Sequence, residues 1–136
     1  MRRIALLLLA TVIASCTTVP PSPTRVAQSR AELQSLIAGK VAQPAISCLP
    51  SYNANDMVVI DENTIAFRSG ASRVYIAHMN GPCSNLGGAG YALLTRQSGG
   101  TGLCSGEIAQ VIDTSARIPV GSCSFGEFVP YVRPRS

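Results

Sequence analysis

From residue 46 onward, the apolar residues of the chain fall in short runs that are separated by Gly, Asn, Asp and Ser. Residues 57–60 and 64–68 are two such runs, and the three residues 61–63 between them predict a β-hairpin with a three-residue turn. A third run, residues 73–79, follows another turn. Because β-branched and aromatic residues are enriched in these runs, we expect a three-stranded meander.

The same strand pattern recurs in three later segments: residues 91–96, 107–113 and 121–129. The last segment, which ends before Pro130, is expected to form one or two short strands. Residues 81–87 begin with Gly-Pro and end with Gly, which predicts a one-turn helix. The five to seven strands lie in residues 46–132, which suffice for one domain. Many short strands in so few residues favour a mainly β, small antiparallel barrel-like domain over a sandwich, because closure hides sheet edges.

A helical pattern precedes the strands at residues 29–39. Ser29 and Glu32 fit a capping box, in which each side chain accepts a hydrogen bond from a backbone N–H of the first turn. Three apolar residues then share one helical face before Gly39 ends the pattern: Leu33, Leu36 and Ile37. A helix of this length is marginal alone, so it either docks this face on the domain or frays.

The most apolar segment is residues 6–14, which follow two arginines and precede Cys16. This run is too short to cross a bilayer as a helix, and its flanks are typical of a secretory signal peptide. Residues 13–16, Ile-Ala-Ser-Cys, resemble the lipobox of bacterial lipoproteins, in which the cysteine is acylated and the chain is cut before it. We therefore expect a signal peptide over residues 1–15 and lipidation of Cys16.

Residues 16–28 contain three prolines and no apolar periodicity, which predicts an extended tether between membrane and domain. Thr17 follows the cysteine, whereas an Asp there would resemble the signal that retains lipoproteins in the inner membrane. The resemblance implies lipid anchoring at the periplasmic face of the outer membrane. A diacylglyceryl group with an amide-linked chain such as palmitate exceeds the two hydrophobic signals that stable anchoring needs.

Removal of the signal peptide changes the charge of the protein. The full chain has a net charge of +4, but two of its eleven basic residues are Arg2 and Arg3, so nine basic and seven acidic residues remain and the net charge falls to +2. The remaining arginines are scattered singly, without a basic stripe or an aromatic platform. Charge and composition therefore argue against a nucleic-acid partner.

The five cysteines form an even set once Cys16 carries lipid, and two disulfides are expected because the periplasm is oxidising. The four that remain are Cys48, Cys83, Cys104 and Cys123. Spacing alone does not choose among their three pairings. A four-thiolate zinc site is the alternative, but no two of these cysteines have the short spacing that is typical of such sites.

Residues 102–106 fit the pattern G-x-C-x-G and resemble a nucleophile elbow with cysteine in place of serine. That motif needs a large α/β sheet and a histidine later in the chain, whereas the single histidine, His78, comes earlier. A disulfide cysteine in a Gly-rich turn is therefore the favoured interpretation of Cys104.

Other candidate residues have structural explanations. His78 ends a predicted strand on its apolar face, which favours a core-edge histidine over a base or a metal ligand and leaves it a weak candidate for ligand binding. Asp61 and Glu62 lie in a predicted turn, where Asp is favoured for local hydrogen bonding. Residues 87–90 are rich in glycine but lack the Lys-Ser/Thr pair of a phosphate-binding loop.

Several segments together resemble a family of small, cysteine-containing envelope proteins of Gram-negative bacteria, catalogued as a domain of unknown function: residues 64–68, 73–76, 81–86, 103–107 and 123–131. The resemblance covers residues 46–131 and implies no catalytic residue. The family's cysteines at the helical turn and near the end of the domain imply that Cys83 pairs with Cys123. Cys48 is then left to pair with Cys104.

These patterns predict a non-enzymatic, disulfide-braced lipoprotein domain that acts in envelope assembly or protein contacts. No cofactor is expected besides the covalent lipid on Cys16. The alternative is a small-ligand or metal-binding module in the same place, and an enzyme comes third. A deep pocket in which His78 and a carboxylate converge would favour the last two, whereas a shallow surface with an exposed apolar patch favours protein contacts.

Overall fold

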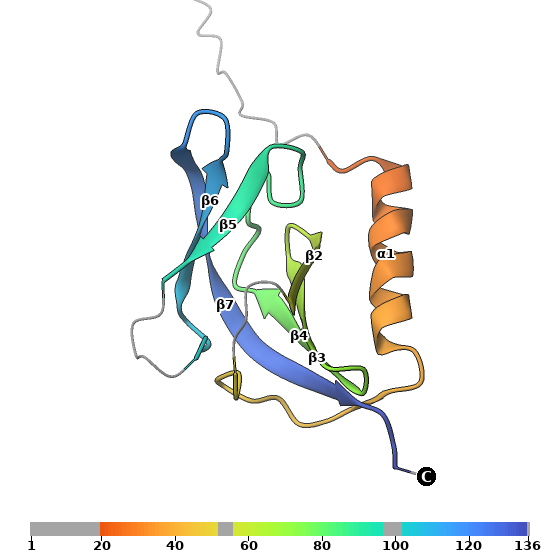
Figure 1. Ribbon diagram of the computed structural model, residues 1–136. Helices are drawn as coiled ribbons and strands as arrows, with labels where there is room; N and C mark the ends of the chain where they lie inside the picture. The colour runs from red at the N-terminus through yellow and green to blue at the C-terminus, as the bar shows by residue number, and fades with distance from the viewer. Residues whose placement is uncertain (1–19, 52–55, 97–101, 136) are drawn as a thin grey trace, which may run out of the picture.

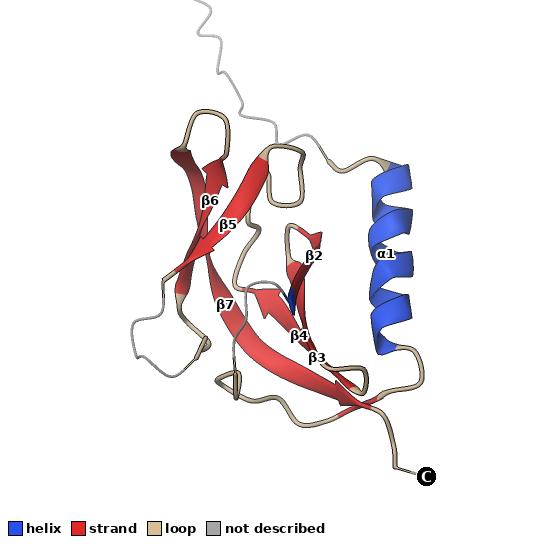
Figure 2. Ribbon diagram, in the orientation of Figure 1, coloured by secondary structure: helices blue, strands red, loops and turns tan. Residues whose placement is uncertain are grey.

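The structure is a computed structural model that describes residues 20–51, 56–96 and 102–135. These residues form one helix, α1 (Pro23–Ile37), beside a curled, half-barrel sheet of antiparallel strands (Figures 1 and 2). The strands are β1 (Val41–Ala42), β2 (Met57–Asp61), β3 (Thr64–Ser69), β4 (Arg73–Met79), β5 (Tyr91–Thr95), β6 (Ile108–Asp113) and β7 (Ile118–Val132). They are ordered β2-β3-β4-β7-β6-β5, with β1 paired to β7. The mainly β, barrel-like fold expected from the sequence is confirmed.

Strand β7 lies at the centre of the sheet and is longer than expected. Its C-terminal part pairs with β4 and its N-terminal part with β6, so it runs through both halves of the sheet (Figure 1). The expectation of one or two short strands ending before Pro130 is wrong. Pro130 is tolerated because its carbonyl accepts a hydrogen bond from the Gln43 N–H (2.8 Å), so its missing N–H faces that peripheral segment and not β4.

The expected meander of β2, β3 and β4 is present, with a shorter first turn. Asp61 pairs with Thr64, so the loop has two residues, Glu62 and Asn63, and not three. A register shift between Val59 and Asp61 absorbs the difference, as a β-bulge does.

The main core lies between the two halves of the curled sheet. The rings of Phe67, Phe125 and Phe128 lie at its centre, with centroids 5.9–6.1 Å apart. Buried residues of β3, β4, β6 and β7 surround them, and loop residues complete the cluster: Leu49, Leu86 and Leu103. Phe125 and Phe128 are therefore core residues.

A second, smaller cluster lies on the opposite face of β2, β3 and β4, where α1 covers it. Its buried members are Ile60, Ala66, Val74 and Ile76. The expected apolar face of the helix docks on this cluster through Leu33, Leu36 and Ile37. Every residue of α1 nevertheless keeps some exposure, so the helix is a cover on the sheet and not part of the main core.

The start of α1 corrects the expected boundaries, because the helix begins at Pro23 and not at Ser29. Ser22 is the N-cap, and its hydroxyl accepts a hydrogen bond from the Arg25 N–H (3.3 Å). Pro23 fits the first turn, where a missing N–H costs no hydrogen bond. Residues 23–28, which were expected to belong to the tether, are therefore helical, and the capping-box pattern at Ser29 is not used.

The other end of the helix agrees with the sequence, since Gly39 has a positive φ of 67° just after the helix ends. The chain then enters β1, which pairs with Tyr131 and Val132 of β7 before residue 46. The β domain thus begins earlier than expected.

The segment 81–87 is also corrected: it forms a turn and not a one-turn helix. The Leu86 N–H donates to the Cys83 carbonyl (3.0 Å), which closes a single turn. Asn85 has a φ of 70°, in the left-handed region that a right-handed helix does not use. This turn still presents Cys83 to a partner on β7.

Candidate functional site

The four cysteines of the described domain form two disulfides, Cys83–Cys123 and Cys48–Cys104. This is the pairing that the family resemblance implied. Cys104 is therefore oxidised, and its backbone N–H donates to the Glu107 carboxylate (3.0 Å). The G-x-C-x-G pattern marks a disulfide cysteine and not a nucleophile.

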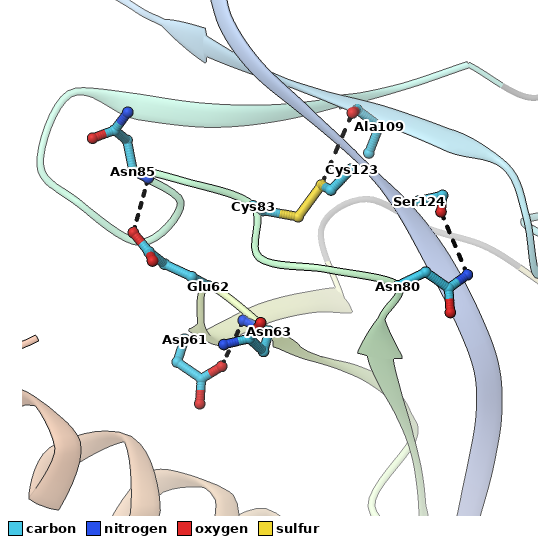
Figure 3. Close-up of a disulfide and its surroundings, with 9 residues drawn as sticks. All are labelled: Asp61, Glu62, Asn63, Asn80, Cys83, Asn85, Ala109, Cys123 and Ser124. Atoms are coloured by element: carbon cyan, nitrogen blue, oxygen red, sulfur yellow. Dashed lines mark hydrogen bonds between the residues drawn. A yellow bond between two sulfur atoms is a disulfide. The ribbon is translucent and has the colours of Figure 1, made fainter. Parts of the chain in front are cut away.

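The Cys83–Cys123 bridge lies beside the tip of the β2–β3 hairpin (Figure 3). The Glu62 carbonyl accepts from the Cys83 N–H (2.7 Å), and the Glu62 carboxylate accepts from the Asn85 N–H (2.9 Å). Asp61 accepts from the Asn63 N–H (2.8 Å), which is the local hydrogen bond expected for Asp in a turn. The hairpin tip and the loop after β4 are thus held together by backbone and side-chain bonds.

His78 lies in β4 opposite Thr64, and its side chain is exposed. It does not line the groove beside α1 that is described below. Within residues 20–51, 56–96 and 102–135, no group of three or more His, Cys, Asp or Glu side chains is placed to hold a metal ion. Among these residues His78 thus belongs neither to that groove nor to such a group.

A hollow of about 570 Å³ lies between the N-terminal half of α1 and the β2–β3 hairpin tip. Its apolar lining residues, which we call its apolar floor, come from α1, β2, the loop after β4 and β5: Val26, Leu33, Ile60, Leu86 and Tyr91. Two arginines, Arg25 and Arg30, belong to the helix wall, and two carboxylates, Asp61 and Glu62, belong to the hairpin wall. We call this hollow the helix groove.

A second surface lies on the outer face of β5 and β6, on the side away from the main core. Leu94 and Ile108 are 44% and 64% exposed there, and both line a shallow hollow of about 540 Å³. Polar residues surround them: Arg96, Ser105, Glu107 and Gln110. We call this surface the β5–β6 face.

The turn between β6 and β7 contains a carboxyl group whose pKa is lowered. Asp113 accepts hydrogen bonds from the Ser115 hydroxyl (2.6 Å) and from the N–H groups of Ser115 and Ala116 (2.8 and 2.9 Å). The Ser115 hydroxyl, followed by the two N–H groups, lowers the pKa of this carboxyl below its usual value of 3.8. The side chain is exposed, so this shift points to a local turn and not to a catalytic group.

Cys16, residues 1–15 and the first part of the expected tether lie outside the described residues. Among the residues that are described, no helix is long and apolar enough to cross a membrane. No protein-family model, no curated protein and no solved structure matches the chain. The lipoprotein signal and the family resemblance therefore stay predictions.

The helix groove was not expected from the sequence, because residues 23–28 were predicted to belong to an extended tether. A signal was present: Val26, Leu33 and Leu36 repeat with helical spacing once the helix is started at Pro23. The prolines at 20, 21 and 23 favoured the extended reading over the helical one.

Proposed function

We propose that the protein is a lipoprotein of the outer membrane, anchored through Cys16, whose disulfide-braced domain contacts an envelope protein on the periplasmic side and catalyses no reaction. The lipobox at residues 13–16 supports the anchor. The two disulfides support it further, because they use the other four cysteines and form in oxidising compartments.

The observation that carries the contact function is the β5–β6 face. Large aliphatic side chains of soluble proteins are exposed singly on most surfaces, whereas neighbouring ones rimmed by polar residues mark interaction sites. Leu94 and Ile108 line one hollow together, and Arg96 and Glu107 lie at its rim. An apolar centre with a charged rim is the usual composition of a protein interface.

Site-specific photocrosslinking in native envelopes tests this function. A photoreactive amino acid at Leu94 or Ile108 should give a discrete adduct of higher mass, and the same amino acid at Gln34, exposed on α1, serves as control. Ile108→Asp should abolish the adduct formed from position 94. Adducts of equal yield at Gln34, or none at positions 94 and 108, would contradict the proposal.

A second function, small-ligand binding, is favoured by the helix groove, whose volume of about 570 Å³ lies within the range of small-molecule sites. This function requires that a small molecule bind the purified protein saturably. If such binding were found and no envelope protein were captured, the order of the two functions would be reversed.

A further inference from the structure

The helix groove exists because α1 touches the sheet with only part of its length. The residues that dock on the sheet, Leu33, Leu36 and Ile37, belong to the C-terminal half of the helix. The N-terminal half turns the same side toward the groove, where Arg25 and Ser29 line the wall. One hydrogen bond crosses between the two elements here, from the Ser29 hydroxyl to the Ile60 carbonyl (2.7 Å).

The groove lies close to the expected membrane anchor. Pro21 lines it, and Pro21 follows Cys16 by five residues. A fully extended chain spans at most about 3.6 Å per residue, so this rim lies within about 18 Å of the lipidated cysteine. Such a distance places the rim near the headgroups of the leaflet that holds the anchor.

The basic lining residues of the groove come from α1 and the acidic ones from the hairpin tip, and the Arg25 guanidinium reaches toward Gly87 in the loop after β4. The cationic wall consists of Arg25 and Arg30 on α1, and the anionic wall consists of Asp61 and Glu62 at the hairpin tip. Guanidinium groups bind phosphate through paired N–H donors, and carboxylates attract an ammonium group. Each carboxylate is already oriented by a backbone N–H, of Asn63 for Asp61 and of Asn85 for Glu62 (Figure 3).

We propose that the helix groove binds a phospholipid with a zwitterionic headgroup, taken from the leaflet that holds the anchor. The phosphate contacts the cationic wall, the ammonium contacts the anionic wall, and part of one acyl chain lies on the apolar floor. An anionic headgroup without an ammonium leaves the anionic wall unpaired, so the groove distinguishes the two lipid classes. This inference rests on the anchoring through Cys16 proposed above.

The test uses the full chain reconstituted in vesicles that contain phosphatidylethanolamine with a photoreactive acyl chain. After irradiation, peptide mass spectrometry should locate adducts in α1 and in residues 85–91. Excess unlabelled phosphatidylethanolamine should compete with this labelling, and excess phosphatidylglycerol should compete about tenfold less well, because the loss of one hydrogen-bonded charged contact costs about a factor of ten in affinity.

Two pairs of variants separate groove binding from general membrane contact. Val26→Trp fills the groove and should lower the adduct yield about tenfold, whereas Ala27→Trp, one position along the same helix and outside the lining, should not change it. Arg30→Gln should weaken competition by phosphatidylethanolamine about tenfold, whereas Arg68→Gln, exposed on β3, should not. Helix content by circular dichroism must match the native protein in all four.

Equal labelling of the native protein and Val26→Trp, or equal competition by the two lipids, would overturn the proposal. The intact mass of the reconstituted chain reports separately whether Cys16 carries lipid. An unlipidated chain that still labels in the groove would contradict the anchor and not the groove. A lipidated chain without groove labelling would contradict the groove and leave the anchor standing.

Discussion

The two halves of the sheet are covered differently. In the half formed by β2, β3 and β4, four consecutive residues are buried in β3 and again in β4, because the main core lies on one face and α1 on the other. In the other half, β5 alternates partly buried and exposed residues, β6 buries only Ala109 and Val111, and β7 begins with three exposed residues. Figure 2 shows the helix beside the first half, and no described element lies on the outer side of the second.

This difference shows what α1 contributes. A strand at the edge of a sheet exposes unpaired backbone groups, and proteins commonly cover such an edge. The helix does so at β2, where Ser29 binds the Ile60 carbonyl, and it shields the aliphatic residues of β3 and β4. At the other edge, β5 pairs with β6 alone among the described strands, and Leu94 and Ile108 stay exposed. The half without a cover is therefore where we expect a partner.

The largest expected effect compares the same substitution in the two halves. Ile76, 3% exposed beneath α1, and Ile108, 64% exposed on the β5–β6 face, are both strand isoleucines. Ile76→Ala should lower the free energy of unfolding by about 2–5 kcal/mol, because it leaves a cavity. Ile108→Ala should change it by about 0.5 kcal/mol or less. Urea denaturation measures both, and equal losses would contradict the difference between the halves.

The Cys83–Cys123 bridge joins the two halves, because it ties the loop after β4 to the N-terminal part of β7. Cys83→Ala combined with Cys123→Ala removes a bridge that spans 40 positions. The free energy of unfolding should fall by about 2–4 kcal/mol, because the unfolded chain regains freedom. Urea denaturation checks this value, and an unchanged midpoint would show that the bridge does not brace the domain.

The contact between α1 and the edge of the sheet should have a smaller effect. Ser29→Ala removes the hydrogen bond to Ile60 and should cost about 0.5–1.5 kcal/mol. Ser35→Ala is the matched control, since the Ser35 hydroxyl donates to the Glu32 carbonyl within the same helix (2.7 Å). Hydrogen exchange of the β2 amides should accelerate in the first variant only. Equal acceleration of exchange in the two variants would contradict this role of the Ser29–Ile60 bond, because it would follow from a weaker helix alone.

The smallest effect concerns the β6–β7 turn in the uncovered half. The lowered pKa of Asp113 means that its stabilising contribution is present above the unfolded value of 3.8 and is lost as the pH falls through the folded value. Asp113→Asn keeps an acceptor oxygen but does not titrate. The difference in melting temperature between the native protein and this variant should therefore shrink on acidification below pH 3.8. A difference that stays constant with pH would contradict this role of the carboxylate.

The sequence predicted the elements whose signals are local. Short apolar runs between turn residues located β5 and β6, and enrichment in β-branched and aromatic residues located the meander. The pairing of Cys83 with Cys123 came from the family resemblance, because spacing allows three pairings.

Two of the errors occurred at prolines, and one concerned the packing of α1 against the sheet. Pro130 looked like the end of a strand, but its N–H position faces a peripheral segment, so β7 continues. Pro23 looked like part of an extended tether, but Ser22 caps a helix there. The helix groove could not be predicted, because it needs both the correct start of α1 and the position of α1 relative to the hairpin tip.

The central claim is that the β5–β6 face is covered by a partner in the envelope. Hydroxyl-radical footprinting of the lipidated protein, in native envelopes and after purification, tests it most directly. We predict that oxidation of Leu94 and Ile108 is lower in envelopes than in the purified protein, while oxidation of Val41, which is 53% exposed elsewhere, is the same in both. Equal oxidation of Leu94 and Ile108 in the two samples would contradict the claim.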